Sequence, residues 1–165
     1  EGFPFQLSCA YDTWVNEEEI CSAVVSMLTR VGLQPTLDIG PRANQSPKMS
    51  KGLSDMFIFG WANEPMLDSY SLLVQVMRSK SGSGGVFNWG NWGDPRIDAL
   101  IDKAGVELDT PKRIEMMKEA LKIAKAEQLF IPMHQQPMAW AMRSSVASTV
   151  QASDNKPRLW LTVMK

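Results

Sequence analysis

The sequence has only one histidine, His134, and only two cysteines, Cys9 and Cys21. These are too few for a metal centre built from histidine and cysteine, and they exclude a catalytic relay with two histidines. The sequence also has no GxSxG, no P-loop and no complete GxGxxG motif. Common signatures of hydrolases, nucleotide-binding proteins and dinucleotide enzymes are therefore missing.

Charge of one sign and long apolar runs are scarce as well. The formal net charge is −1 and basic residues form no block, which makes nucleic acid and anionic membrane poor partners. The apolar runs are only a few residues long, far short of a membrane span. The 165 residues are enough for one domain with its own core. The chain starts without methionine or a signal peptide, which fits a processed product or an excised fragment and leaves export open.

Cys9 and Cys21 are too few for a disulfide scaffold and lack CxxC spacing. The favoured interpretation is two buried thiols that pack as small hydrophobic groups. A disulfide is the alternative if the compartment is oxidising.

The first 40 residues have the pattern of a β-α-β unit. Residues 3–11 alternate with the period of a strand, and Asn16 followed by three glutamates is typical of a helix start. Apolar residues at helical spacing continue to Val31, and Gly32 ends the helix. Residues 33–40 form a second strand, which predicts two neighbouring parallel strands with a right-handed crossover.

Further along, extended and helical patterns alternate. The continuous apolar run at 56–59 predicts a strand covered on both faces. Residues 95–128 predict two helices joined near 106–109. Other expectations are a loop or short helix at 41–54, a helix at 66–77, a flexible break at 79–85, extended structure at 129–142 and a last strand at 158–165. The fold class is α/β, and we expect burial of Ile20, Val24, Leu28, Ile58, Leu121 and Ile131.

Tryptophan stands out, with six residues in the chain. Trp61 follows the strand at 56–59, and the carboxyl ends of strands in open α/β sheets are where ligands usually bind. Trp89 and Trp92 lie in the glycine-rich stretch "FNWGNWGDP". Indoles on such loops offer rigid apolar area and an N–H donor, and amides add donors and acceptors. The predicted ligand-binding residues are Trp61, Asn63, Glu64, Asn88, Trp89 and Trp92; the alternative is that the indoles cap the core.

Catalytic alternatives rest on few residues. His134 is more simply a structural residue, but a small α/β hydrolase or transferase could use it with Glu64 or Asp68 if they lie within hydrogen-bond reach. The "GSGG" segment at 82–85 lacks the lysine of a phosphate loop and is better explained as a connector.

Several phrases resemble the peptide/nickel group of ABC-transporter solute-binding proteins. They are "DMFIFGWANEPMLDSY" and the stretch from "GGVFNWGNWGDPRIDALIDKAGVELD" through "TPKRIEMMKEALKIAKAEQLFIPMHQQPMAWAMRSSV". The resemblance rests on the order and spacing of these phrases, which run from Gly60-Trp61 through residues 88–102 to Arg143. The similarity runs through nearly the whole chain.

This resemblance implies the second lobe of a type II periplasmic-binding-protein-like fold, with a mixed β-sheet flanked by helices. Residues 1–143 would form the C-terminal lobe, and residues 144–165 a tail that returns toward an absent first lobe. It further implies a periplasmic or lipid-anchored protein that delivers a peptide or similar solute to a membrane permease, without enzymatic activity or cofactor. A fragment of this kind should self-associate or expose Trp140, Leu159 or Trp160.

The resemblance also implies that the strand ending in Gly60-Trp61 presents its tryptophan to the cleft between the lobes. Peptide-binding relatives carry an aspartate shortly afterwards, whereas this chain has a shorter link with Glu64. The ligand therefore stays open between peptide, nickel complex, heme, oligosaccharide and opine. A regulator that uses such a lobe to sense a ligand is a further alternative.

Overall fold

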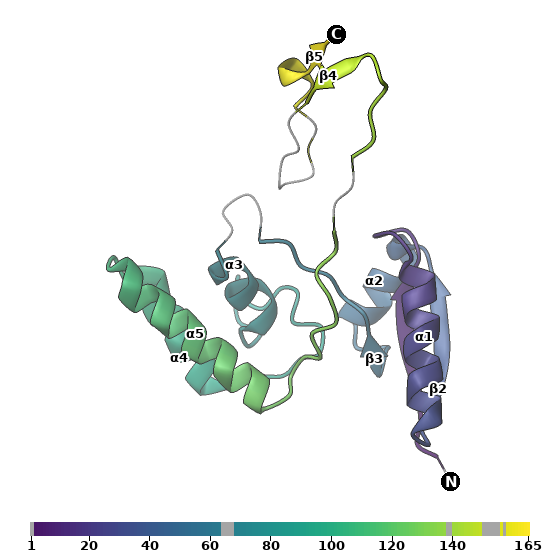
Figure 1. The fold of residues 1–165 in the computed structure, drawn as a ribbon. Helices are drawn as coiled ribbons and strands as arrows, with labels where there is room; N and C mark the ends of the chain where they lie inside the picture. Colours follow the sequence, from purple (N-terminus) through teal and green to yellow (C-terminus); the bar gives the residue numbers. More distant parts are fainter. Residues whose placement is uncertain (1, 64–67, 138–139, 150–155, 157) are drawn as a thin grey trace.

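The computed structural model describes residues 2–63, 68–137, 140–149, 156 and 158–165. In chain order, these residues form a sheet with helices, then a group of helices, and finally a small C-terminal hairpin. Figure 1 shows the sheet and the helical group side by side, with the hairpin apart from both. The α/β class predicted from the sequence is confirmed.

The sheet has three parallel strands in the order β2-β1-β3. Strand β1 (Pro4–Ala10) pairs with β2 (Gln34–Gly40) over its whole length, and with β3 (Met56–Phe57) at Leu7 and Ser8. The predicted β-α-β unit and the strand at 56–59 are confirmed, although β3 is only two residues long. All three carboxyl ends lie at one edge, because the strands are parallel.

Helices cover both faces of this sheet. Helix α1 (Glu17–Arg30) packs on the face that carries Leu7 and Cys9. Helix α2 (Arg42–Ser50) packs on the opposite face, where Asp38 of β2 meets it. The option of a short helix within residues 41–54 is therefore the correct one.

Cys9 and Cys21 form a disulfide between β1 and α1, with their Cα atoms 6.5 Å apart. The favoured interpretation of two free thiols was wrong. The strand alternation that turns Cys9 toward α1 brings it to Cys21, which is fully buried in the second turn of that helix. The two lie 12 positions apart in sequence, so the pairing depends on how α1 packs back on β1 and not on a local motif.

The ends of α1 differ in how well the sequence predicted them. Asn16 occupies the N-cap position with a left-handed backbone (φ 60°) but its side chain makes no capping hydrogen bond. The Glu17 carboxylate instead accepts a hydrogen bond from the Thr13 N–H at 3.0 Å. At the other end Gly32 has a φ of +89° and closes the helix, as predicted.

The helical group contains α3 (Tyr70–Leu72), which continues as the π-helix η1 (Leu73–Met77), and the antiparallel pair α4 (Pro95–Val106) and α5 (Thr110–Ala126). Asp94 and Asp109 cap α4 and α5 by accepting hydrogen bonds from backbone N–H groups. Two helices within residues 95–128 are thus confirmed. Their shared core consists of Leu73, Met77, Ile97, Ile101, Ala104, Met117, Ala120 and Ala124.

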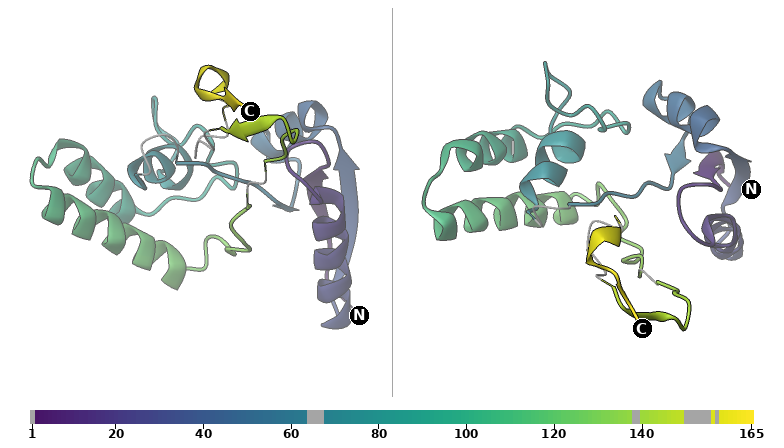
Figure 2. Two further views of the ribbon diagram at one scale, coloured as in Figure 1. Left: turned by 45° about the horizontal axis from the view of Figure 1, so that its top comes forward. Right: turned by 90° about the horizontal axis from the view of Figure 1, so that it is seen from above.

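The C-terminal part crosses the space between the two groups and ends in a hairpin of β4 (Val146–Ser148) and β5 (Val163–Met164), which Figure 2 shows apart from both. The 3₁₀ turn η2 (Leu159–Leu161) precedes β5. No described residue between Leu129 and Met142 belongs to a strand. The predicted last strand is reduced to two residues.

The burial predictions were too optimistic. Ile131 is 72% exposed, because its irregular segment has no helix or strand to cover it. Five others lie at the borders of the cores and are only half-buried: Ile20, Val24, Leu28, Ile58 and Leu121. Leu159 and Trp160 are 72% and 75% exposed, as expected for a fragment, whereas Trp140 is half-buried. No helix in the described ranges is long and apolar enough to cross a membrane.

Candidate ligand-binding site at the end of the sheet

Alternation along β3 and its continuation separates two sets of side chains. Met56 and Ile58 pack against the buried residues of the sheet and α1. Phe59 and Trp61 instead stack on each other, with ring centroids 6.0 Å apart. The apolar run at 56–59 therefore contacts the core on one side and other aromatic rings on the other. This explains why it lacks the alternating polar residues of a strand with one exposed face.

Five rings form an aromatic cluster at this end of the sheet: Phe57, Phe59, Trp61, Phe87 and Trp89. Phe59 contacts Trp89 edge-on at 5.1 Å, and Trp61 contacts Phe87 edge-on at 5.3 Å. Edge-to-face pairs at these distances are favourable beyond the area they bury. The cluster therefore joins the continuation of β3 to the loop at 87–89.

The loop at 87–89 is held by Asn88, which is 1% exposed. Its side-chain nitrogen donates to the carbonyl oxygens of Arg78 at 2.9 Å and Trp92 at 2.8 Å. The Phe87 N–H also donates to the Gln75 carbonyl. These bonds fix Phe87 and the following tryptophan against the helical group.

The structure thus brings together only some of the predicted residues. Trp61 and Trp89 share the aromatic cluster, and Asn88 supports it from within. Trp92 packs on the helical core and contacts Phe130, with ring centroids 5.8 Å apart. Its place favours the alternative of an indole that caps the core. Glu64 lies outside the described residues.

Three polar atoms of the cluster and its two connecting segments are buried without a hydrogen-bond partner in the described part of the chain. They are the indole nitrogen Nε1 of Trp61 and the amide oxygens Oδ1 of Asn63 and Asn88. Burying an unpaired donor or acceptor is unfavourable. The indole nitrogen is a donor and the amide oxygens are acceptors.

A cavity of about 90 Å³ opens at the carboxyl ends of the parallel strands. It takes residues from the end of β1, the start of α1, helix α2 and the continuation of β3. Trp89 belongs both to this cavity and to the aromatic cluster. Among its lining residues only Trp89 was predicted as a site residue. Trp14 was missed although it follows the carboxyl end of a predicted strand, and nothing in the sequence pattern indicated Gln45. The lining residues are Ala10, Thr13, Trp14, Glu17, Arg42, Gln45, Ser46, Met49, Ile58, Phe59, Gly60 and Trp89.

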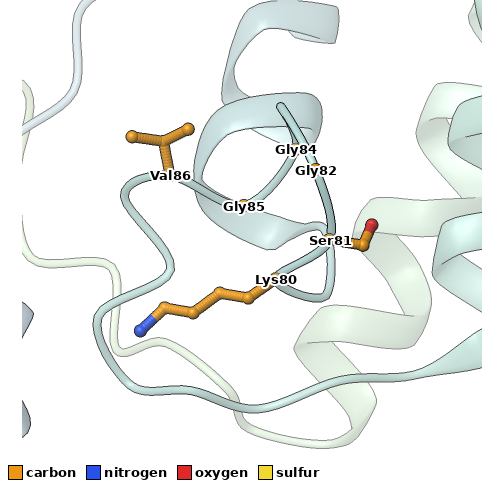
Figure 3. A pocket seen from close by; sticks show the side chains of 6 residues that line it. All are labelled: Lys80, Ser81, Gly82, Gly84, Gly85 and Val86. Carbon is orange, nitrogen blue, oxygen red and sulfur yellow. The ribbon is translucent and has the colours of Figure 1, made fainter.

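A larger hollow of about 360 Å³ lies at the bend of residues 80–86 (Figure 3). Ser81 and Gly84 form an isolated bridge across the bend, and Gly82 and Gly85 have positive φ. Lys80 is the one charged residue lining it. The geometry is that of the connector predicted from the sequence.

The catalytic alternative that pairs Asp68 with His134 is not formed. The Asp68 carboxylate accepts hydrogen bonds from the Tyr70 backbone N–H at 2.8 Å and from Arg113 at 2.6 Å, and these two partners lower its pKa. His134 is exposed, and its ring nitrogen Nε2 lies 3.1 Å from the amide oxygen of Gln136. In the described ranges, no group of three or more histidine, cysteine, aspartate or glutamate residues could hold a metal ion.

No family model matches the sequence. Oligopeptide-binding protein OppA of Mycobacterium tuberculosis, and the same protein of Mycobacterium bovis, are 31% identical to this chain over 103 residues. The match covers 62% of this chain and 16% of each relative. The chain therefore aligns with about a sixth of their length.

Solved structures match the fold over a larger share of the chain. HbpA2 from Haemophilus parasuis matches 99% of this chain and 32% of its own, with a TM-score of 0.71 and 17% identity. NikA from Staphylococcus aureus in complex with Ni(L-His)2 matches 77% and 26%, with a TM-score of 0.66 and 15% identity. The fold is type II periplasmic-binding-protein-like, and part of the chain is similar in sequence to the oligopeptide-binding OppA proteins.

Proposed function

We propose that this chain is part of the substrate-binding component of an ABC importer. Residues 1–143 form most of the second lobe, and residues 144–165 return toward a first lobe of the same protein. A peptide-like or other small solute is enclosed between the lobes and passed to a permease in the membrane. Binding by two hinged lobes buries the ligand without chemical conversion.

The observation that carries the proposal is the aromatic cluster at the carboxyl edge of a parallel sheet. Ligands of open α/β sheets bind at that edge. Trp61 and Trp89 supply apolar area there. Asn88 positions the loop that carries Trp89, so its part in binding is indirect. Asn63, Glu64 and Trp92 remain proposed contacts from the sequence pattern alone.

The disulfide supports a place outside the cytoplasm. Structural disulfides form and persist in oxidising compartments such as the bacterial periplasm. The Cys9–Cys21 bond is fully buried, as in a structural disulfide. A periplasmic or lipid-anchored position fits this observation and the proposed transport role.

A regulator built on the same lobe is the competing function. It would bind a ligand at the same cluster but would carry an N-terminal helix-turn-helix in place of a secretion signal. Sequencing the complete reading frame separates the two. The hydrolase alternative can no longer use Asp68 with His134, because these two side chains have other partners. It would have to use Glu64 with His134.

The test is calorimetry on the protein expressed from the complete reading frame and on the 165-residue chain. The probes are trialanine, nickel–histidine, heme, maltotriose and octopine. We expect the complete protein to bind one probe class and the 165-residue chain to bind it at least about 100-fold more weakly, because half of the contacts are missing. Equal affinities, or turnover of a probe, would contradict the proposal.

A further inference from the structure

Arg78 lies where the π-helix η1 ends and the chain enters the bend of residues 80–86. Its guanidinium donates a hydrogen bond to the carboxylate of Asp102 on α4, and its side chain is 23% exposed. The backbone N–H of the next residue, Ser79, donates to Asp98 on the same helix at 3.0 Å. Two neighbouring residues are therefore bound to α4 at positions one turn apart.

The side chain and the carbonyl group of Arg78 both pack against buried glycines of the bend. A Cβ at Gly84 would collide with Cδ of Arg78, and a Cβ at Gly85 would lie 2.5 Å from its carbonyl oxygen. The same oxygen accepts the hydrogen bond from the Asn88 side chain at 2.9 Å. The bend therefore approaches Arg78 as closely as only glycine allows.

Asn88 directly precedes Trp89, whose ring belongs to the aromatic cluster. Trp89 lies in an irregular loop, so its orientation depends on these side-chain contacts and not on a helix or strand. A continuous series of contacts thus leads from Asp102 on α4 through Arg78 and Asn88 to the indole.

We propose that Arg78 is a positioning residue for the ligand-binding surface. Its ion pair with Asp102 holds the loop that presents Trp89 to the solute, and it acts through Asn88 without touching the solute itself. This inference rests on the proposed function and adds to it a residue outside the aromatic cluster. Without the guanidinium, the carbonyl of Arg78 loses its fixed place and Trp89 takes several orientations. Ordering the indole again on binding lowers the affinity.

The experiment uses the protein from the complete reading frame, labelled with 5-fluorotryptophan. Fluorine NMR reports the surroundings of each indole, and Trp89→Phe assigns the Trp89 signal. Arg78→Met removes the guanidinium but retains an unbranched apolar stem. The matched control is Arg96→Met, which breaks ion pairs with Asp94 at the start of α4 and with Glu127 at the end of α5.

Without ligand, Arg78→Met should shift or split the Trp89 signal, whereas Arg96→Met should leave it in place. The spectra are recorded well below the unfolding transition, where a loss of stability alone does not move the native signal. Asp102→Asn should have the same effect as Arg78→Met, and the double variant should add little, because both changes break one interaction. Arg78→Lys, which keeps the charge, should move the signal back toward its wild-type position.

Affinity is measured by calorimetry with whichever of trialanine, nickel–histidine, heme, maltotriose and octopine the complete protein binds. We expect Arg78→Met to weaken this binding by about 2- to 10-fold, the range for ordering one side chain on association. Arg96→Met should bind like the wild type. If Arg78→Met fails to fold, Asp102→Asn still decides, because it changes the more exposed partner of the pair.

An unchanged Trp89 signal in Arg78→Met and Asp102→Asn would overturn the inference. Wild-type affinity of both variants would overturn it as well, and the proposed function would then stand. If the wild type binds none of the probes while the variants shift the Trp89 signal, the proposed function fails and the positioning of Trp89 by Arg78 stands.

Discussion

Removing the Cys9–Cys21 disulfide should destabilise the chain by about 3 kcal/mol. The bond closes a loop with a sequence separation of 12 residues. The loop-closure relation gives an entropy of about 9 to 10 cal/mol/K for this length, or about 3 kcal/mol at 25 °C. Domains of this size are stable by only about 5–15 kcal/mol, so the loss is a large fraction of the total.

The assay is urea denaturation followed by far-UV circular dichroism, with the oxidised chain compared with the chain refolded in reductant. Both forms keep the same side chains, so the difference in unfolding free energy reports the cross-link. The control is the double variant Cys9→Ala, Cys21→Ala, whose stability should not respond to reductant. Equal urea midpoints for the oxidised and reduced wild type would refute the reasoning, as would reactive thiols in the denatured, unreduced chain.

Three further predictions concern other parts of the chain. Asn88→Ala should lower the unfolding free energy by about 2–3 kcal/mol in urea denaturation, because two part-buried carbonyl oxygens lose their donor. An unchanged midpoint would contradict the support role of Asn88. Asp68→Asn should cost about 1 kcal/mol at pH 7. Because folding lowers the pKa of Asp68, this difference should be full above about pH 4 and should vanish as the pH falls through the folded pKa; a pH-independent difference would exclude the Arg113 ion pair as its source. Replacing the exposed Leu159 and Trp160 with serine should reduce self-association in light scattering, whereas a wild type that is already strictly monomeric would argue against an uncovered lobe surface.

Periodicity predicted the elements that depend on local sequence. The alternation of residues 3–11 and the apolar spacing of α1 gave the β-α-β unit, and α4 and α5 came close to their observed ends. Each of these segments buries one face or stripe against a neighbour, so the pattern is visible in the residues themselves. The two-residue β3 was predicted two residues too long, because its continuation stays apolar for two further reasons. Ile58 still packs on the core and its N–H donates to the Ser8 carbonyl, whereas Phe59 belongs to the aromatic cluster.

Features that depend on contacts between residues distant in sequence could not be predicted from the sequence pattern. The disulfide forms because α1 packs back on the face of β1 that carries Cys9, and no local motif indicates this pairing. Trp14 and Gln45 meet at one cavity only because the parallel strands bring their carboxyl ends together. For Trp92 the sequence offered the same glycine-flanked context as for Trp89, and only the packing on Phe130 separates the two.

The central claim is that a solute binds on the aromatic cluster around Trp61. The most direct measurement is calorimetric titration of the protein from the complete reading frame with the probe that it binds, in wild type, Trp61→Ala and the control Trp160→Ala. We predict that Trp61→Ala weakens binding by about 1–3 kcal/mol, the scale for losing one buried aromatic contact, and that Trp160→Ala has no effect. Equal affinities of the wild type and Trp61→Ala would contradict the claim.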